Sequence, residues 1–526
     1  MTALTGTLRL ARLQVRTGWK GLLFGPVLLA GLVLAIAHSI VGLYPTAEAR
    51  AAYAASNAIA PASAAFNGRW ADLDTLGGIT TNEVGFLALL LFPTVASLLA
   101  VRHTRREEDA GRTDLVTAGC VGRLAPLAAG SLVVAVAMVL VGLLAFAGQV
   151  WVGLPSAGSG WYAASLALFA LSFAATGLLA AEVSRDARTA TGLSLAAVFG
   201  MFVLRAALDA GNRSLWWVTP SGWLPRVAPF GDPQAWPLVA YLVLSGLALG
   251  AAAWVAVHRD LYGGLVAARP GPATARAALT TPFGLAWRLT RGAAVGWSVG
   301  VVAWGLSMGA LSTEMTALLR ANPQLLEALG IDRPEDVLTA MSATLAAVGA
   351  AALVVQGVLR LAAEEDSGRL GLVASGPTRR RAFWLAWGLV LAVEVLVVLV
   401  VQALAFGLTT WRVSRVLENL TASLQAALAL GPAVLLVGAV GLAVRAAVPR
   451  LAAVAWLLVG WMAVVGFVGD ALDLPIWARR LSPAYAVGRV PVDDPNVGVL
   501  AAFVGAALVL VVASAGAFSR RDLRAG

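Results

Sequence analysis

The chain has 526 residues, of which 59% are hydrophobic and only 13% are charged, and its mean hydropathy is +0.82. Soluble proteins carry about 25% charged residues, so this composition excludes a soluble globule and a disordered chain, and the single cysteine, Cys120, excludes a disulfide-rich secreted scaffold. The net charge of +10 fits the arginine-rich cytoplasmic loops of a membrane protein better than a nucleic-acid-binding surface.

The chain opens with a predicted amphipathic helix. Basic side chains recur at spacings of three and four residues, at Arg9, Arg12, Arg16 and Lys20. Apolar side chains recur in the same way on another face, at Leu4, Leu8, Ala11 and Val15. We expect this helix to lie in the cytoplasmic interface, with its basic face against anionic headgroups. The alternative is an arginine-rich anchor with no further role. A similar apolar lead-in from Phe283 precedes Arg288 and Arg291 in mid-chain.

Lys20 is the only lysine of the chain, and it lies in Trp19-Lys20-Gly21. A phosphate-cradling Walker A loop requires Gly-Lys followed by Ser or Thr, so the sequence contains no such loop. His-Glu-x-x-His and Gly-x-Ser-x-Gly motifs are also missing, and the three histidines are scattered. We therefore predict a non-catalytic chain with no cofactor or metal of its own.

Twelve apolar stretches are long enough to cross a bilayer, which takes about 20 residues each. They lie near 21–44, 84–101, 124–150, 160–182, 190–209, 235–257, 292–312, 341–361, 383–408, 421–444, 451–472 and 496–518. The predicted fold class is an all-α polytopic membrane protein with about 12 transmembrane helices.

Basic residues are divided unevenly between the two sides of these spans. Twenty-six lie on the side of the termini and 11 on the opposite side, while Arg205 lies within a span. Positively charged loops remain in the cytoplasm, so we predict that both termini of this multi-pass protein are cytoplasmic. Ala47-Glu48-Ala49 resembles a signal-peptide cleavage site. The apolar run before it is longer than the core of about 7–15 residues of a signal peptide, so we expect it to be retained.

An acidic segment follows the second predicted span and recurs 257 residues later, as Glu107-Glu108-Asp109-Ala110-Gly111-Arg112 and Glu364-Glu365-Asp366-Ser367-Gly368-Arg369. Nine of 17 positions match when the alignment is carried to residues 123 and 380. Two more landmarks repeat around the last span of each half. Thr219-Pro220-Ser221 and Ser482-Pro483-Ala484 precede it, and Arg259-Asp260-Leu261 and Arg521-Asp522-Leu523 follow it.

This shared order of landmarks indicates duplication and fusion. Six spans per half is an even number, so the halves are predicted to be parallel repeats with one orientation. We place the two transmembrane halves at 1–268 and 283–526, joined by a cytoplasmic linker at 269–282.

Each acidic segment lies in a short predicted cytoplasmic loop. Glu108 and Arg112 are four residues apart, as are Glu365 and Arg369, so we expect each pair to meet across a helical turn. Gly111 and Gly368 allow the backbone to bend. Leu115-Val116 and Leu372-Val373 then offer a small apolar face, which suits docking into a groove of another protein. The alternative is two solvated charge runs.

Together these features resemble the fused permeases of type-2 ABC exporters, in particular the actinobacterial exporters of polyketide antibiotics such as the tetronasin-type permeases. The resemblance covers nearly the whole chain and implies a multi-pass protein of the bacterial cytoplasmic (inner) membrane. It implies that the repeated loops are coupling helices that insert into a cytoplasmic ATPase, a role that would fall on Glu107, Glu108, Gly111, Arg112, Glu364, Glu365, Gly368 and Arg369. It also implies short re-entrant helices at 212–233 and 473–495, although the second segment lacks the Gly-Trp-Leu-Pro run of the first.

The resemblance and the missing Walker A loop together imply that ATP and Mg are bound by a separate ATPase chain. Two coupling loops on one permease chain imply two copies of that ATPase. The other expected partners are membrane lipid and a hydrophobic small-molecule cargo such as an antibiotic or drug, and no nucleic acid.

Few charged residues lie within the predicted spans. Glu394 lies about halfway along the ninth span, where a charge costs about 2.5–3.5 kcal/mol. It is either a protonated or hydrogen-bonded buried group or a side chain that lines the translocation path. Arg205 and Asp209, four residues apart, are predicted to form a structural pair.

Two other functions fit twelve spans. An ion-driven secondary transporter with 6+6 repeats would carry several acids deep in its spans, but Glu394 is the only deep one. A membrane-embedded transferase acting on lipid-linked sugars would carry acids at catalytic spacing in the outer loops 45–83 and 313–340, and no such spacing is recognisable there. Within the ABC class, apolar spans suit a lipid or glycolipid cargo as well as a drug.

Overall fold

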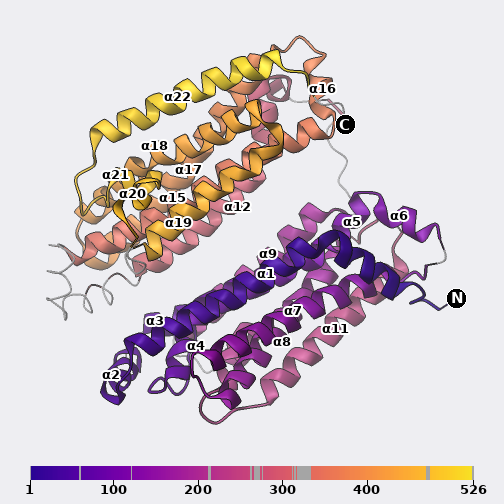
Figure 1. Cartoon of the computed structure of the whole chain (residues 1–526), viewed down its shortest axis with the longest axis vertical. Coiled ribbons are helices and arrows are strands. Elements are labelled where there is room, and N and C mark those ends of the chain that lie inside the picture. The colour runs from indigo at the N-terminus through magenta and orange to yellow at the C-terminus, as the bar shows by residue number, and fades with distance from the viewer. Residues whose placement is uncertain are drawn as a thin grey trace. The chain divides into compact units, whose positions relative to one another are not determined.

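The computed structural model describes residues 2–58, 61–119, 121–210, 215–260, 263–265, 273–274, 277–310, 312, 316, 333–469 and 474–523. Across these ranges every regular element is a helix, which confirms the predicted all-α fold class. The chain divides into two compact units, Met1–Pro270 and Gly271–Gly526, and each is described by itself (Figure 1).

The first unit is a bundle of long helices with short helices at both ends. Its elements are α1 (Thr7–Leu43), α2 (Ala47–Ala58), α3 (Pro61–Asn67), α4 (Leu76–Arg102), α5 (Arg105–Asp109), α6 (Arg112–Thr117), α7 (Ala125–Trp151), α8 (Ser156–Val183), α9 (Ala187–Ala210), η1 (Trp216–Val218), α10 (Pro220–Trp223), η2 (Leu224–Val227) and α11 (Trp236–His258).

The second unit repeats this plan. Its elements are η3 (Ala277–Thr280), α12 (Pro282–Ala310), α15 (Pro334–Asp366), α16 (Arg369–Ala374), α17 (Arg380–Ser414), α18 (Glu418–Ala447), η4 (Pro449–Val454), α19 (Ala455–Val468), α20 (Ile476–Arg480), α21 (Pro483–Val487) and α22 (Val497–Arg520).

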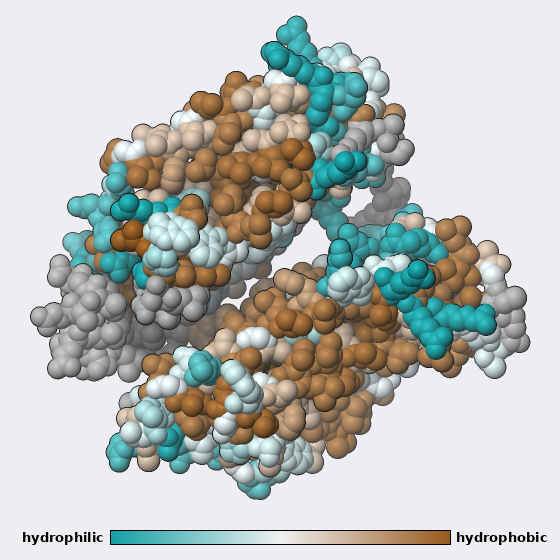
Figure 2. Space-filling model, in the orientation of Figure 1, coloured by the Kyte–Doolittle hydropathy of each residue, from teal (hydrophilic) through white to brown (hydrophobic). Residues whose placement is uncertain are grey.

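Twelve helical segments in the described part of the chain are long and apolar enough to cross a bilayer, six in each unit, as the hydropathy pattern predicts. They run from 18 to 37 residues, or about 27–55 Å at 1.5 Å per residue, and the longest therefore project beyond a hydrocarbon core of about 30 Å. Brown apolar surface covers the long helices in Figure 2, and polar residues gather toward their ends. This is the surface of a multi-pass membrane protein.

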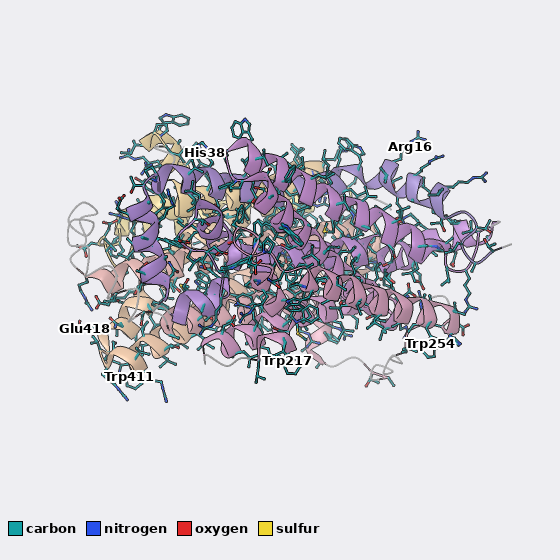
Figure 3. The ribbon with its side chains drawn as sticks, turned by 90° about the horizontal axis from the view of Figure 1, so that it is seen from below. Arg16, His38, Trp217, Trp254, Trp411 and Glu418 are labelled. Atoms are coloured by element: carbon teal, nitrogen blue, oxygen red, sulfur yellow. The ribbon has the colours of Figure 1, made fainter. Side chains whose placement is uncertain are left out.

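The predicted entry helix and the first predicted span form one continuous helix. Both belong to the single helix α1, which has 37 residues and packs against α4 and α7. Its first half stays on the bundle because Gly18 and Gly21 fit closely against His103 and Arg102, where an added Cβ would lie 3.0 Å and 2.3 Å from side-chain atoms. The basic side chains remain exposed, and Arg16 points away from α1 in Figure 3. In the second unit Arg288 and Arg291 likewise lie within the long helix α12.

Short helices precede the last long helix of each unit, where the family resemblance places them. In the first unit η1, α10 and η2 occupy this segment, and the Tyr241 hydroxyl on α11 donates to the Pro220 carbonyl at 2.8 Å. In the second unit α20 and α21 occupy it. Residues 212–214 and 473 of the two predicted segments lie outside the described residues.

The repeated acidic segments lie at equivalent ends of the two units. In the first unit α5, α6 and the N-terminus lie at one end, and α2 and α3 lie at the other (Figure 1). In the second unit α16 and the C-terminus lie at one end, and α20 and α21 lie at the other. Each unit therefore presents its repeated loop on the side of its chain terminus.

Candidate functional site

Each repeated loop is a sharp corner between two helices. Gly111 has φ 72° and Gly368 has φ 75°, in the left-handed region that favours glycine. The N–H of Gly111 donates to the Glu108 carbonyl, and the N–H of Gly368 donates to the Glu365 carbonyl, both at 2.9 Å. A new short helix, α6 or α16, begins directly after each glycine. The predicted backbone bend is thus present in both copies.

The arginine of each loop pairs with the first glutamate and not with the second, so the expected pairs four residues apart are wrong. Arg112 donates to both carboxylate oxygens of Glu107, at 2.6 and 2.8 Å. Arg369 donates to Glu364 at 2.6 and 3.3 Å. The left-handed glycine explains the change, because it breaks the helical register on which a four-residue spacing depends. Hydrogen bonds to these glutamates raise the pKa of both guanidinium groups above their usual range.

Each loop also holds a leucine out of the fold. Leu115 on α6 is 80% exposed and Leu372 on α16 is 78% exposed, the two highest values among the exposed large hydrophobic residues of the described chain. They are equivalent positions of the repeat. Val116 and Val373, which follow them, are only partly exposed. The predicted apolar face therefore consists mainly of one leucine per loop, presented by a corner that its own hydrogen bonds hold.

The second glutamate of the first loop is buried in a cluster of charges. Glu108 is only 4% exposed and accepts two hydrogen bonds from Arg259, at 2.8 and 2.7 Å. Arg259 also donates to Glu182 at 2.6 Å, and Arg105 lies 2.9 Å from Glu108. Burial opposes the charge of Arg259, but Glu108 and Glu182 outweigh it and raise the pKa of that guanidinium. The cluster joins α5, the end of α8 and the residue after α11.

The second unit builds the same junction from a different set of charges. Glu365 is 1% exposed and accepts two hydrogen bonds from Arg521, at 2.6 and 2.7 Å. Arg445, near the end of α18, donates to Glu365 at 2.8 Å and to Asp366 at 2.9 Å. Arg521 follows α22 directly, just as Arg259 follows α11.

The sequence identified only part of these clusters. Glu108, Glu365, Arg259 and Arg521 all belong to repeated landmarks, but spacing along the chain does not show that the loop and the last span meet. Arg105, Glu182 and Arg445 were missed. Their only signal is a charged residue at the edge of an apolar stretch, a pattern that many solvated loop residues share.

Comparison with known proteins gives two matches. Residues 279–519 match the family described as "Multidrug efflux system permease Rv1217c, C-terminal domain". The multidrug efflux system permease protein Rv1217c of Mycobacterium tuberculosis (strain ATCC 25618 / H37Rv) is 33% identical over 532 residues, covering 99% of this chain and 96% of that protein. The chain belongs to the Rv1217c permease family. This agrees with the expected transporter permease class. The more specific resemblance to tetronasin-type exporters is not supported by these matches.

In this member of the Rv1217c permease family the two junctions differ in packing. A cavity of about 410 Å³ lies beside the first cluster, and Thr113, Pro126 and Ala256 are among its lining residues. The corresponding cavity of the second unit measures only about 10 Å³ and is lined by Leu370, Phe383 and Phe518. In the repeat, Thr113 corresponds to Leu370, Pro126 to Phe383 and Ala256 to Phe518. Larger apolar side chains therefore fill the second junction.

Three charged residues within the predicted spans of this permease-family chain, Arg205, Asp209 and Glu394, are buried. Arg205 contacts Asp209 at 2.8 Å, as predicted, and donates to the carbonyls of Ala65 and Phe66 at the end of α3. Glu394 is 1% exposed between α17 and α12, where it is 2.6 Å from the Thr290 hydroxyl. Its role in a translocation path stays a prediction.

Proposed function

We propose that the chain is the membrane-spanning subunit of an ABC exporter, and that its repeated loops dock into two copies of a separate cytoplasmic ATPase. The ATPase would bind ATP and Mg, since this sequence contains no Walker A loop. The cargo would be a hydrophobic drug or antibiotic, which agrees with the name of the M. tuberculosis relative as a multidrug efflux permease. The protein would lie in the bacterial cytoplasmic membrane with both termini in the cytoplasm.

The observation that carries this proposal is the pair of exposed leucines on the repeated loops. Covering a leucine that is about four-fifths exposed would be favourable, because it removes apolar area from water. Leu115 and Leu372 occupy equivalent positions, so two equivalent grooves would cover them. Two such loops on one chain match two copies of one ATPase.

Burial of the other loop residues supports the same conclusion. Glu108 and Glu365 anchor each corner internally, so the leucines are presented in a fixed direction. A preorganised contact loses less conformational entropy on binding than a flexible loop does. Solvated charge runs, the alternative for these segments, would not place their glutamates inside the fold.

The test is affinity purification of the tagged protein from its native membranes, followed by mass spectrometry for ABC ATPases. We expect the wild-type protein to retain such an ATPase and the double variant Leu115→Asp/Leu372→Asp to lose it, together with drug resistance. The matched control is Leu417→Asp, which also changes a leucine that is 59% exposed, at the N-cap of α18, where aspartate is a favourable residue. If the double variant retains the ATPase as well as the control does, these loops are not the docking sites.

A further inference from the structure

The last long helix of each unit is tied to the repeated loop by one preserved ion pair. Arg259 and Arg521 are the first residues after α11 and α22, and each donates two hydrogen bonds to the second glutamate of its loop, Glu108 or Glu365. A two-pronged guanidinium contact fixes direction as well as distance. The loop and the helix end are therefore held as one piece.

The two units retain this pair while the charges around it differ. In the first unit Arg105 and Glu182 complete the cluster. In the second unit alanine stands at the position equivalent to Arg105, and an arginine, Arg445, occupies the corresponding end of the fourth long helix. Asp366 then supplies the second acid. Each cluster contains two cations and two anions, and the glutamate with the arginine after the last helix is the common part.

In the second unit the last helix, α22, packs against α17 and α18, but few of its side chains are fully buried. Only 11% of the apolar window of α22 is buried, the lowest value among the twelve candidate spans of the described chain. Three of its four buried residues, Ser514, Ala515 and Phe518, lie near its loop end. There Trp384 donates to the Ser514 hydroxyl at 2.9 Å and stacks on Phe518. The buried side chains of α22 are thus concentrated toward the end that carries Arg521.

We infer that Glu108 with Arg259, and Glu365 with Arg521, form the joints through which a movement of each docked loop is carried to the last helix of its half. These four are positioning residues that act on the helices and do not touch ATP. The inference rests on the proposed function, since it assumes an ATPase that moves the loops. It adds that α11 and α22 move with the loops and are not passive neighbours of the bundle.

The first experiment separates docking from transmission. The double variant Arg259→Lys/Arg521→Lys keeps both charges but loses the two-pronged contact. We expect it to co-purify with the ATPase as the wild-type protein does, while the stimulation of ATP hydrolysis by an exported drug falls by on the order of tenfold, within the usual range of coupling between sites. The matched control is Arg489→Lys, in the exposed pair of Arg489 with Asp493 on the same unit, and it should change neither readout.

The second experiment starts from a protein in which both arginines are kept, so its first comparison does not depend on the folding of the lysine variants. Spin labels are placed at Ser375→Cys and Ala517→Cys, both exposed, in a Cys120→Ala background of the full complex. The distance between the two labels should be the same with and without vanadate-trapped nucleotide. The distribution of that distance should become broader when Arg521→Lys is added. A changed distance in the otherwise unaltered protein, or full drug stimulation in the double lysine variant, overturns the joint. Failure of the wild-type protein to retain any ABC ATPase overturns the proposed function instead.

Discussion

At the scale of single residues, the two loop glycines give the most direct test of the corner. Gly368 has φ 75°, which costs an ordinary L-residue about 1–2 kcal/mol, whereas asparagine tolerates this region better. We expect Gly368→Ala to reduce export clearly and Gly368→Asn to reduce it less. Drug resistance in cells, normalised to the amount of protein in the membrane, is the measurement. Wild-type activity of Gly368→Ala would show that the left-handed corner is dispensable.

Glu394 gives a second test at this scale. The single hydroxyl proton of Thr290 has two acceptors nearby, the Ala286 carbonyl at 3.0 Å and Glu394 Oε1 at 2.6 Å. Both contacts are satisfied together if Glu394 carries a proton and donates it to Thr290. Glutamine also offers a donor at nearly the same size, so we expect Glu394→Gln to keep normal expression and ATPase coupling, with any change confined to the range of exported drugs.

Membrane expression and thermal stability of the detergent-solubilised protein are the readouts for this variant. The matched control is Glu394→Leu, which removes this hydrogen bond but leaves the Thr290 hydroxyl its contact with the Ala286 carbonyl, and it should lower stability by about 0.5–1.5 kcal/mol. Collapse of the glutamine variant would instead indicate an ionised Glu394.

The sequence allowed only part of the geometry of the repeated loops to be predicted. The sequence marks Gly111 and Gly368 correctly as bends, because a glycine between two short polar helical segments readily adopts the left-handed region. It does not reveal that Arg112 reaches Glu107, since the left-handed turn changes which side chains face each other. The hydrogen bonds of Tyr53 with Glu83 and Asn82 were also missed, because α2 and α4 are brought together only by tertiary packing.

At the scale of the elements, the loop arginines and glutamates are expected to act as internal braces of α6 and α16. Reversing both arginines, Arg112→Glu/Arg369→Glu, places like charges beside Glu107 and Glu364 and should open the corners. Export and ATPase association should both fall. Adding Glu107→Arg and Glu364→Arg restores an opposite-charge pair in each loop, and we expect a substantial part of both activities to return. ATPase co-purification and drug resistance are measured for both sets.

The outcome of that exchange distinguishes two roles of the arginines. If each arginine instead binds a carboxylate of the ATPase, the variant with all four substitutions still lacks that contact. Neither ATPase association nor export would then return. The structure favours the brace, since both carboxylate oxygens of Glu107 already accept hydrogen bonds from Arg112.

Hydropathy predicts the long elements well and their ends poorly. The number of membrane-length helices follows from the length and composition of the apolar stretches. The continuity of α1 does not, because its basic face resembles that of a separate surface helix, and only the close approach of Gly18 and Gly21 to the end of α4 shows that it stays in the bundle.

At the scale of the whole molecule, topology remains a prediction from the uneven distribution of basic residues. Ser367 is exposed beside the second corner. In a Cys120→Ala background, Ser367→Cys should be protected from a membrane-impermeant thiol reagent in intact cells and should react once the membrane is permeabilised. The matched control is Ser414→Cys at the opposite end of α17, which is predicted to lie outside and should react in intact cells. Reversed labelling of the two positions would invert the orientation.

The balance of positive and negative charge in each cluster limits which residues of one half can replace their counterparts in the other half. Glu182→Arg would bring the first cluster toward the composition of the second, but alone it would leave three arginines beside Glu108. Breaking a buried ion pair in this way typically costs about 3–5 kcal/mol. Adding Arg105→Ala would leave the set seen in the second unit, with Asp109 standing where Asp366 binds Arg445. A double-mutant cycle on the stability of the purified protein should therefore show the pair to be much less harmful than the sum of the single changes. The ancestral duplicate would then have diverged through compensated steps, and residues of one half can be grafted into the other only as sets.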